Sequence, residues 1–280
     1  MEDKAKTELI PRLSERKDLE EIEDASRSAW KYIKTKQRLV LVLLVILTIC
    51  SLISIIVYPY TYLIAVFLPI ALCLLFFLLV FRDKFRADFL KQFAKQNGYN
   101  FESIGLVSEI FSSTYLNNIR DPRVNNLITG EHKNHAIKFF EFQGSAGSGK
   151  SKREFEFSVS KIETENYLPK IFLRRKNLLN LSSPSFDETG MQELRLEGDF
   201  NKYFSSYIVK GDQIAALQIL APDTMAKIID YGKMFNLEFI GNNVFIYADW
   251  LIDDKANLNI LHTLTKILID ELELVGKISK

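Results

Sequence analysis

Cysteine, glycine, proline and histidine are all scarce in this chain of 280 residues. Two cysteines cannot build a disulfide framework, and 12 glycines with 7 prolines exclude collagen-like and low-complexity classes. An excess of charge of either sign is also lacking, because the chain has 36 basic and 35 acidic side chains. This balance excludes a strongly basic nucleic-acid binder, so we expect no nucleic-acid partner.

Charged residues are absent altogether from residues 39–81, a run of 43 residues. One helix of that length would measure about 65 Å, twice the hydrocarbon thickness of a bilayer of about 30 Å. Tyr58-Pro59-Tyr60 supplies a break, since proline lacks an N–H and disfavours helix at the preceding residue. The run therefore predicts a transmembrane helical hairpin with spans near Leu39–Val57 and Tyr62–Phe81. The alternatives are a cleaved signal peptide and a buried globular hairpin, and 43 uncharged residues suit neither.

Basic side chains flank this run on both sides: Lys31, Lys34, Lys36, Arg38, Arg82, Lys84 and Arg86. The positive-inside rule then predicts a multi-pass protein of the bacterial inner (plasma) membrane with both termini in the cytoplasm. These seven residues are the expected contacts to the membrane surface, with the lipid bilayer as partner. Neither span carries a charged residue, which favours an anchor over a small oligomeric channel.

The rest of the chain divides by pattern into further parts. We expect a cytoplasmic N-terminal helix in 1–38, the hairpin in 39–81, a juxtamembrane helix in 82–98 and a cytoplasmic domain in 99–280. Phe85, Phe89 and Phe93 form one stripe of the juxtamembrane helix, and either dock on the following domain or lie in the membrane interface.

Residues 99–280 alternate in the manner of β-strands joined by short turns. Expected strands are Leu127–Glu131, Ala136–Gln143, Phe155–Val159, Tyr167–Arg175 and Glu193–Glu197, with a turn at Lys133-Asn134 and a hairpin over Glu238–Tyr247 that turns at Gly241-Asn242-Asn243. Helices are expected from Pro222 to about Phe235 and after Asp253-Asp254. Short turns favour antiparallel pairing. The predicted fold class is α+β: an N-terminal helix and a transmembrane hairpin followed by a mainly antiparallel sheet with packed helices.

Gly144-Ser145-Ala146-Gly147-Ser148-Gly149-Lys150-Ser151 matches the spelling of a phosphate-binding P-loop. In that reading Gly144 and Gly149 let the backbone approach phosphate, Lys150 contacts phosphate, Ser151 meets the metal, and Asp249 is offered as second carboxylate. A P-loop requires a helix directly after the motif, whereas Phe155, Phe157 and Val159 alternate as a strand does. A Gly/Ser loop between antiparallel strands explains the same letters.

The remaining polar residues form no recognised catalytic or metal pattern. His132 and His135 bracket the Lys133-Asn134 turn without a third ligand, which favours a solvated turn over a zinc site. His262 has no visible acid or base partner, and no nucleophile pattern is present. We therefore predict no cofactor, no metal and no catalytic residue.

Three segments carry a family resemblance: Leu196-Glu197-Gly198-Asp199-Phe200 with Lys202-Tyr203-Phe204, Ala221-Pro222-Asp223-Thr224-Met225, and Val244-Phe245-Ile246-Tyr247. Together with the segment Phe140–Phe157, they resemble a family of uncharacterised bacterial two-span membrane proteins with a cytoplasmic domain of unknown function. The resemblance implies this organisation and a loop between strands at 144–151. It carries over no catalytic residues.

The sequence thus predicts a membrane-anchored, non-enzymatic binding or scaffold module. Its expected partner is another protein or a second copy of the chain. The alternative is a membrane-tethered nucleotide-binding enzyme that uses Gly144–Ser151.

Overall fold

The computed structural model describes residues 84–280 except 118, 148–151, 177–189 and 279–280. The chain divides into two compact units between Phe93 and Ala94. A helix covers residues 84–96, and in its first part the side chains of the expected stripe, Phe85, Phe89 and Phe93, are buried. Gly98 ends the helix with a φ of 70°, and the N–H of Tyr99 donates to the carbonyl of Ala94 at 2.8 Å.

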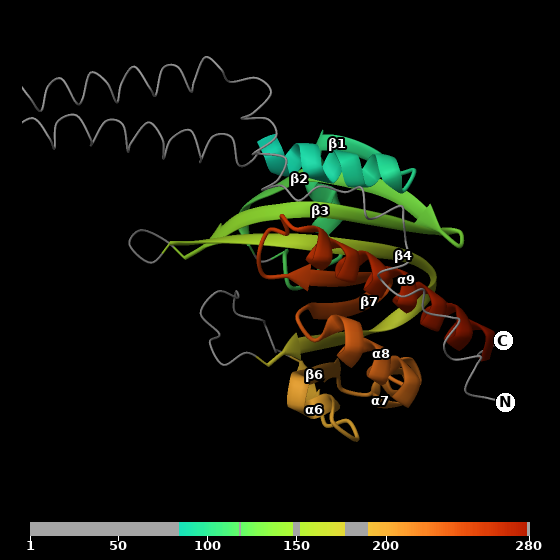
Figure 1. The fold of residues 1–280 in the computed structure, drawn as a ribbon. Helices are drawn as coiled ribbons and strands as arrows, with labels where there is room; N and C mark the ends of the chain where they lie inside the picture. Colours follow the sequence, from blue (N-terminus) through green and yellow to red (C-terminus); the bar gives the residue numbers. More distant parts are fainter. Residues whose placement is uncertain (1–83, 118, 148–151, 177–189, 279–280) are drawn as a thin grey trace, which may run out of the picture. The chain divides into compact units, whose positions relative to one another are not determined.

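The second unit is built on a seven-stranded antiparallel sheet (Figure 1). Its strands are β1 (Asn100–Ile104), β2 (Arg120–His132), β3 (His135–Ala146), β4 (Arg153–Arg175), β5 (Met191–Leu194), β6 (Phe204–Val209) and β7 (Asn236–Ala248). The β2–β3 turn lies at Lys133 and Asn134, with φ values of 50° and 62°. Two consecutive positive φ values are what a tight hairpin turn demands, so the predicted turn is confirmed.

Strand β7 is itself a hairpin, nested inside a second one formed by β4. The hydroxyl of Tyr247 donates to Glu238, and Asn236 donates to Asp249 at 3.0 Å. Nine extended residues would span about 30 Å, so β7 must fold back between these pairs. The fold-back includes Gly241, with a φ of 58°, as the sequence predicts.

The turn within β4 explains the order of the sheet. Pairing of β4 with β7 shifts between Glu163 and Leu168, where β4 turns around the tip of β7. Across the sheet the order is therefore β1, β2, β3, the first arm of β4, the two arms of β7, the second arm of β4, β6 and β5 (Figure 1). The two strands predicted at 155–159 and 167–175 are the two arms of β4.

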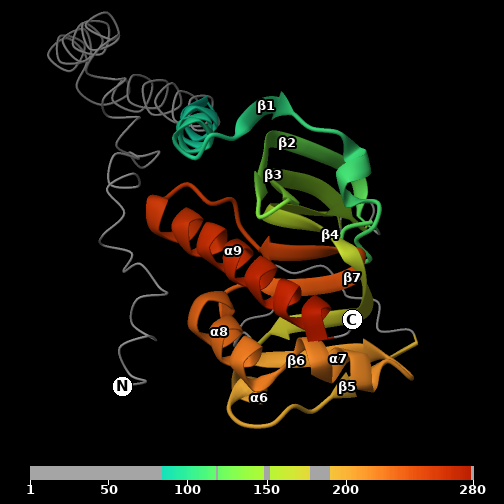
Figure 2. The ribbon, with the colours of Figure 1, turned by 90° about the vertical axis from the view of Figure 1, so that its right-hand side faces the viewer.

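Helices and a long connection cover the two faces of this sheet. The helices are η1 (Val107–Ile110), α6 (Phe200–Tyr203), α7 (Gln213–Ile219), α8 (Pro222–Gly232) and α9 (Lys255–Ile278). Helix α9 crosses one face (Figure 2), where the hydroxyls of Thr265 and Ser160 lie 2.8 Å apart. On the other face the connection 105–119 buries Tyr115 against Phe157 and Tyr247, with ring centroids 5.7 and 5.2 Å apart. The core is thus split between two layers.

The predicted transmembrane architecture requires a correction. Among the described helices, none is long and apolar enough to cross a membrane. The 24-residue α9 is amphipathic: Leu261 and Leu268 are buried while Lys266 and Asp270 belong to its polar side. Residues 39–81, to which the hairpin was assigned, lie outside the described residues, as does the expected helix in 1–38. The fold class is therefore corrected to a mainly antiparallel sheet with a few helices. The multi-pass membrane location predicted with the hairpin is not supported by any described helix.

Candidate functional site

The P-loop-like segment connects β3 to β4. Ala146 pairs with Arg153 across this connection, and residues 148–151 lie outside the described part. A strand, β4, begins at Arg153, where a P-loop would have its helix. Gly144 itself sits inside β3, where an added Cβ would lie 2.4 Å from Ile119 and 3.0 Å from the carbonyl oxygen of Arg120. Close packing, without any ligand, therefore explains this glycine.

We expect Gly144→Ala to lower the free energy of unfolding by about 1–3 kcal/mol, because the added methyl group overpacks the contact with Ile119. Lys152→Ala, at an exposed side chain of the same connection, is the matched control and should stay within about 0.5 kcal/mol of the parent. Urea unfolding measures both. If Gly144→Ala had the same free energy of unfolding as the parent, close packing would not explain the glycine at this position.

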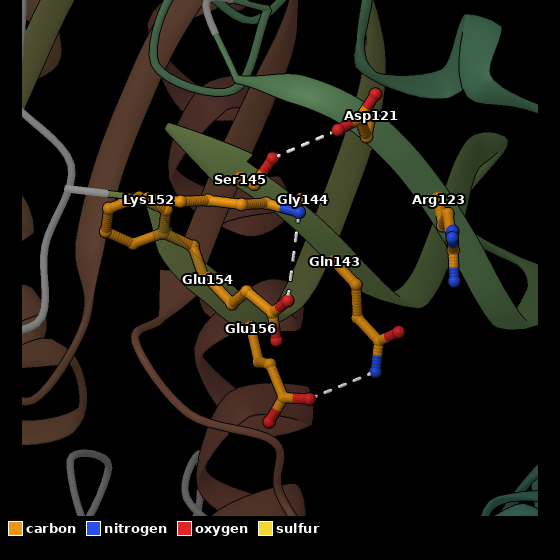
Figure 3. Close-up of a pocket in the computed structure, with 9 residues that line it drawn as sticks. Asp121, Arg123, Gln143, Gly144, Ser145, Lys152, Glu154 and Glu156 are labelled. Atoms are coloured by element: carbon orange, nitrogen blue, oxygen red, sulfur yellow. Dashed lines mark hydrogen bonds and ion pairs between the residues drawn. The ribbon is translucent and has the colours of Figure 1, made fainter. Parts of the chain in front are cut away.

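A polar cleft opens beside this connection (Figure 3). It has a volume of about 220 Å³ and is lined chiefly by Asp121 and Arg123 of β2, Gln143 and Ser145 of β3, and Glu154 and Glu156 of β4. Gly144 and Ser145 of the P-loop-like segment also line it, but the sequence did not indicate its charged residues on β2 and β4. Its acidic residues alternate with the buried Phe155 and Phe157, a pattern that by itself indicates only the solvated face of a strand.

Hydrogen bonds within the cleft are few and mostly exposed. Ser145 donates to Asp121 at 3.2 Å, and Gln143 donates to Glu156 at 3.2 Å. Lys152 and Glu154 form an ion pair of 4.0 Å, with half or more of each side chain exposed. Exposed pairs of this kind contribute about 0–1 kcal/mol, so a ligand can replace them at little cost.

A second surface is apolar and lies where β1 passes into η1. Ile104, Leu106 and Phe111 are 77, 71 and 63 % exposed, and we call these three residues the apolar strip. Isolated exposed apolar residues are ordinary, but here three lie within eight positions of the chain. Exposed apolar residues that gather on a surface mark interaction sites. The strip adjoins β1, which pairs only with β2 among the described strands.

Ion pairs fix η1 in the middle of the strip. Glu109 accepts from Lys138 at 2.9 Å and from Lys161 at 3.2 Å, and Glu163 accepts from both lysines at 2.9 Å. Burial alone would lower the pKa of Lys138, but hydrogen bonds to Glu163 and Glu109 outweigh it and raise that pKa. Burial likewise opposes the lowered pKa of Glu163, which Lys138 and Lys161 produce. Lys138 and Glu163 therefore stay charged near neutral pH. The ion pairs of Glu109 with Lys138 and Lys161 hold η1 on the sheet.

A buried carboxylate holds the chain just beyond the strip. Glu238 has no exposed surface, and it accepts from Ser113 Oγ at 3.0 Å, from the N–H of Thr114 at 2.9 Å, and from the hydroxyls of Thr114 and Tyr247. Burial raises the pKa of Tyr247 well above its ordinary value, and the neighbouring Glu238 adds to the effect. Because the carboxylate of Glu238 is fully buried, its role is to anchor the connection 105–119 to β7.

Asp249, the proposed second carboxylate of the nucleotide reading, is also engaged in structure. Its side chain is 1 % exposed, accepts from Arg175 at 2.9 Å and from Asn236 at 3.0 Å, and so joins β4 to β7. The guanidinium of Arg175 also stacks on Trp250, 5.6 Å from the ring centroid. These contacts give Asp249 a structural role within the sheet.

The histidines likewise contact neighbouring elements. His132 lies 3.8 Å from Asp270 and His135 lies 3.8 Å from Glu273, both on α9. Burial lowers the pKa of His132, and Lys266 lowers it further. The buried His262 lies 3.0 Å from the Tyr99 hydroxyl. Within the described ranges, no group of three or more His, Cys, Asp or Glu side chains is arranged to hold a metal ion.

Of the basic residues predicted to face a membrane, two are described. Lys84 is exposed and Arg86 is buried, at 4 % exposure. Lys31, Lys34, Lys36, Arg38 and Arg82 lie outside the described residues, as do Gly149, Lys150 and Ser151 of the P-loop-like segment.

Comparison with known proteins gives one informative likeness. No family model and no curated protein matches the sequence. The fold is similar to the crystal structure of the mycobacterial trehalose monomycolate transport factor A, TtfA, with a TM-score of 0.50 and 15 % sequence identity. The match covers 67 % of this chain and 94 % of that chain. At such low identity the likeness concerns the fold alone, and the family resemblance of the sequence stays a prediction.

Proposed function

We propose that the described domain is a non-enzymatic binding module that docks a protein partner on the apolar strip. The observation that carries this proposal is the exposure of Ile104, Leu106 and Phe111, each more than 60 %, where β1 passes into a connection that is otherwise firmly held. Glu109 fixes the connection at η1 and Glu238 fixes it at Ser113 and Thr114. A rigid apolar surface loses little conformational entropy on binding, which favours recognition.

The adjoining strand suggests how the partner pairs. Strand β1 pairs with β2 along one side, and no other described strand lies along its second side. An extended partner segment that pairs with this edge would place alternate side chains next to the apolar strip, a mode known as β-augmentation. Asp249, which was offered as the second carboxylate of a nucleotide site, is occupied by contacts inside the fold, and so is His262.

The test replaces one apolar side chain of the strip by a charged one. Leu106→Asp should abolish co-purification of the partner from cells that make the full chain, because a charge would be buried in the interface. Its stability should change by no more than about 0.5 kcal/mol, since Leu106 is 71 % exposed. Leu217→Asp, at another exposed leucine on α7, is the control and should retain the partner. Retention by Leu106→Asp would refute the proposal.

A further inference from the structure

We propose that the polar cleft between β2, β3 and β4 binds a small ligand that carries both a positive and a negative group, such as a short peptide with free termini. This inference concerns a surface other than the apolar strip and does not depend on the proposed function. It rests on the placement of opposite charges on the two walls, on the size of the cleft and on a distortion of β2.

Both signs of charge lie along the cleft, with Arg123 near Asp121 on β2 and Glu154 and Glu156 near Lys152 at β4 (Figure 3). Arg123 extends from β2, and among the described residues none forms a hydrogen bond or ion pair with its guanidinium. Glu154 and Glu156 extend from β4, on the far side of β3. The two outer strands are separated by two strand spacings, or about 10 Å, and Gln143 lies between them. Long side chains from both walls can therefore contact the two ends of one small ligand that lies over β3.

The charges select against ligands of a single sign. An anion attracted to Arg123 also meets Asp121, Glu154 and Glu156, and a cation attracted to those carboxylates also meets Arg123 and Lys152. A ligand with an anionic end toward Arg123 and a cationic end toward Glu154 and Glu156 satisfies both walls. The amide of Gln143 is placed to meet a peptide group between the two ends.

A bulge in β2 shapes the wall that carries Arg123. The pairing of β2 with β3 shifts between Arg120 and Arg123, and Asp121 has a φ of 53°, unusual for a residue other than glycine. Bulges of this kind re-aim side chains and are frequent beside binding sites, where local strain is retained for function. Here Asp121 meets Ser145, and Arg123 lies across from β4.

The size of the cleft limits the ligand. Its volume of about 220 Å³ is below the range of about 300–1,000 Å³ typical for drug-sized ligands. An amino acid or a peptide of two or three residues suits this space, whereas a nucleotide is too large.

The experiment is calorimetric titration of the full chain with alanyl-alanine, with its N-acetylated form and with its C-terminal amide. We expect the dipeptide with free termini to bind, and each blocked form to bind about tenfold more weakly or worse, because each lacks one charge-assisted hydrogen bond. Arg123→Gln should weaken the free dipeptide by a similar factor and leave the amide unaffected. Glu156→Gln should weaken the free dipeptide and leave the N-acetylated form unaffected.

Arg153→Gln is the matched control, because Arg153 is exposed near the cleft but does not line it. It should bind the free dipeptide as the parent does. No binding of the free dipeptide at millimolar concentration, or equal binding of the free and blocked forms, would overturn the inference. Either result would leave the apolar strip and its protein partner untouched.

Discussion

Replacing Glu238 by leucine should lower the free energy of unfolding by about 3–5 kcal/mol. The substitution leaves the N–H of Thr114 and three hydroxyl groups without the acceptor that they share in the core. A buried donor without a partner costs about 1–3 kcal/mol. The hydroxyls of Ser113 and Tyr247 are such donors, whereas Thr114 is half-buried. Urea unfolding of the full chain, followed by tryptophan fluorescence, measures the loss.

Two comparisons separate this effect from a general loss of packing. Glu238→Gln keeps the shape and one acceptor oxygen, and the hydroxyls of Ser113 and Tyr247 can turn to accept from its amide, so it should cost clearly less than Glu238→Leu. Glu102→Leu, at an exposed glutamate of β1, should be close to neutral. If Glu238→Leu were as stable as Glu102→Leu, the connection 105–119 would not depend on this carboxylate.

Replacing Arg175 by methionine should cost about 3–5 kcal/mol, because it leaves the carboxylate of Asp249 buried without its cation. The same change removes the stacking of the guanidinium on Trp250. Thermal unfolding would show the loss as a lower midpoint than that of the parent chain.

The double variant Arg175→Met with Asp249→Leu tests the cause. Removing both charges should restore much of the lost stability, since an apolar pair often replaces a buried ion pair at little cost. A double variant no more stable than Arg175→Met alone would show that packing of Arg175, and not the unpaired charge, accounts for the effect. Neither result is expected to alter binding at the apolar strip, because Arg175 and Asp249 join β4 to β7 elsewhere in the sheet.

Local signals in the sequence predicted the elements with distinctive ends. The Lys133-Asn134 turn, the fold-back at Gly241 and the start of α8 at Pro222 all follow from residues whose backbone preferences are narrow. The antiparallel pairing of β2 with β3 followed from the first of these turns, and that of β3 with β4 from the Gly/Ser loop between them. These preferences act over a few residues, which is why the sequence alone reveals them.

Features set by distant contacts escaped the sequence analysis. Strand β6 and helix α7 were not expected, and the nesting of β7 within β4 depends on pairings far apart in the chain. Glu238 was assigned only to a strand, because its partners Ser113 and Thr114 precede it by more than 120 residues. The cleft was missed for the same reason: Arg123 and Glu156 face one another only once β3 lies between them.

The sequence also could not show that the side chains of the apolar strip are exposed. A leucine or phenylalanine in a sequence predicts burial, and Ile110, next to Phe111, is indeed buried at 1 % exposure. Only the structure shows that Phe111 points outward, because Glu109, Ser113 and Thr114 fix the orientation of this connection. The exposure of the strip is thus a consequence of buried polar contacts on either side of it.

Site-specific photo-crosslinking tests whether a protein partner docks on the apolar strip. A photoreactive amino acid is placed at position 106 of the full chain in living cells, and at position 217 on α7 as the control. We expect a discrete crosslinked protein at position 106 and none at position 217. The adduct at 106 should be lost when Ile104→Asp is added to the same chain. The same adduct from both positions, or no adduct from position 106, would contradict docking on the strip.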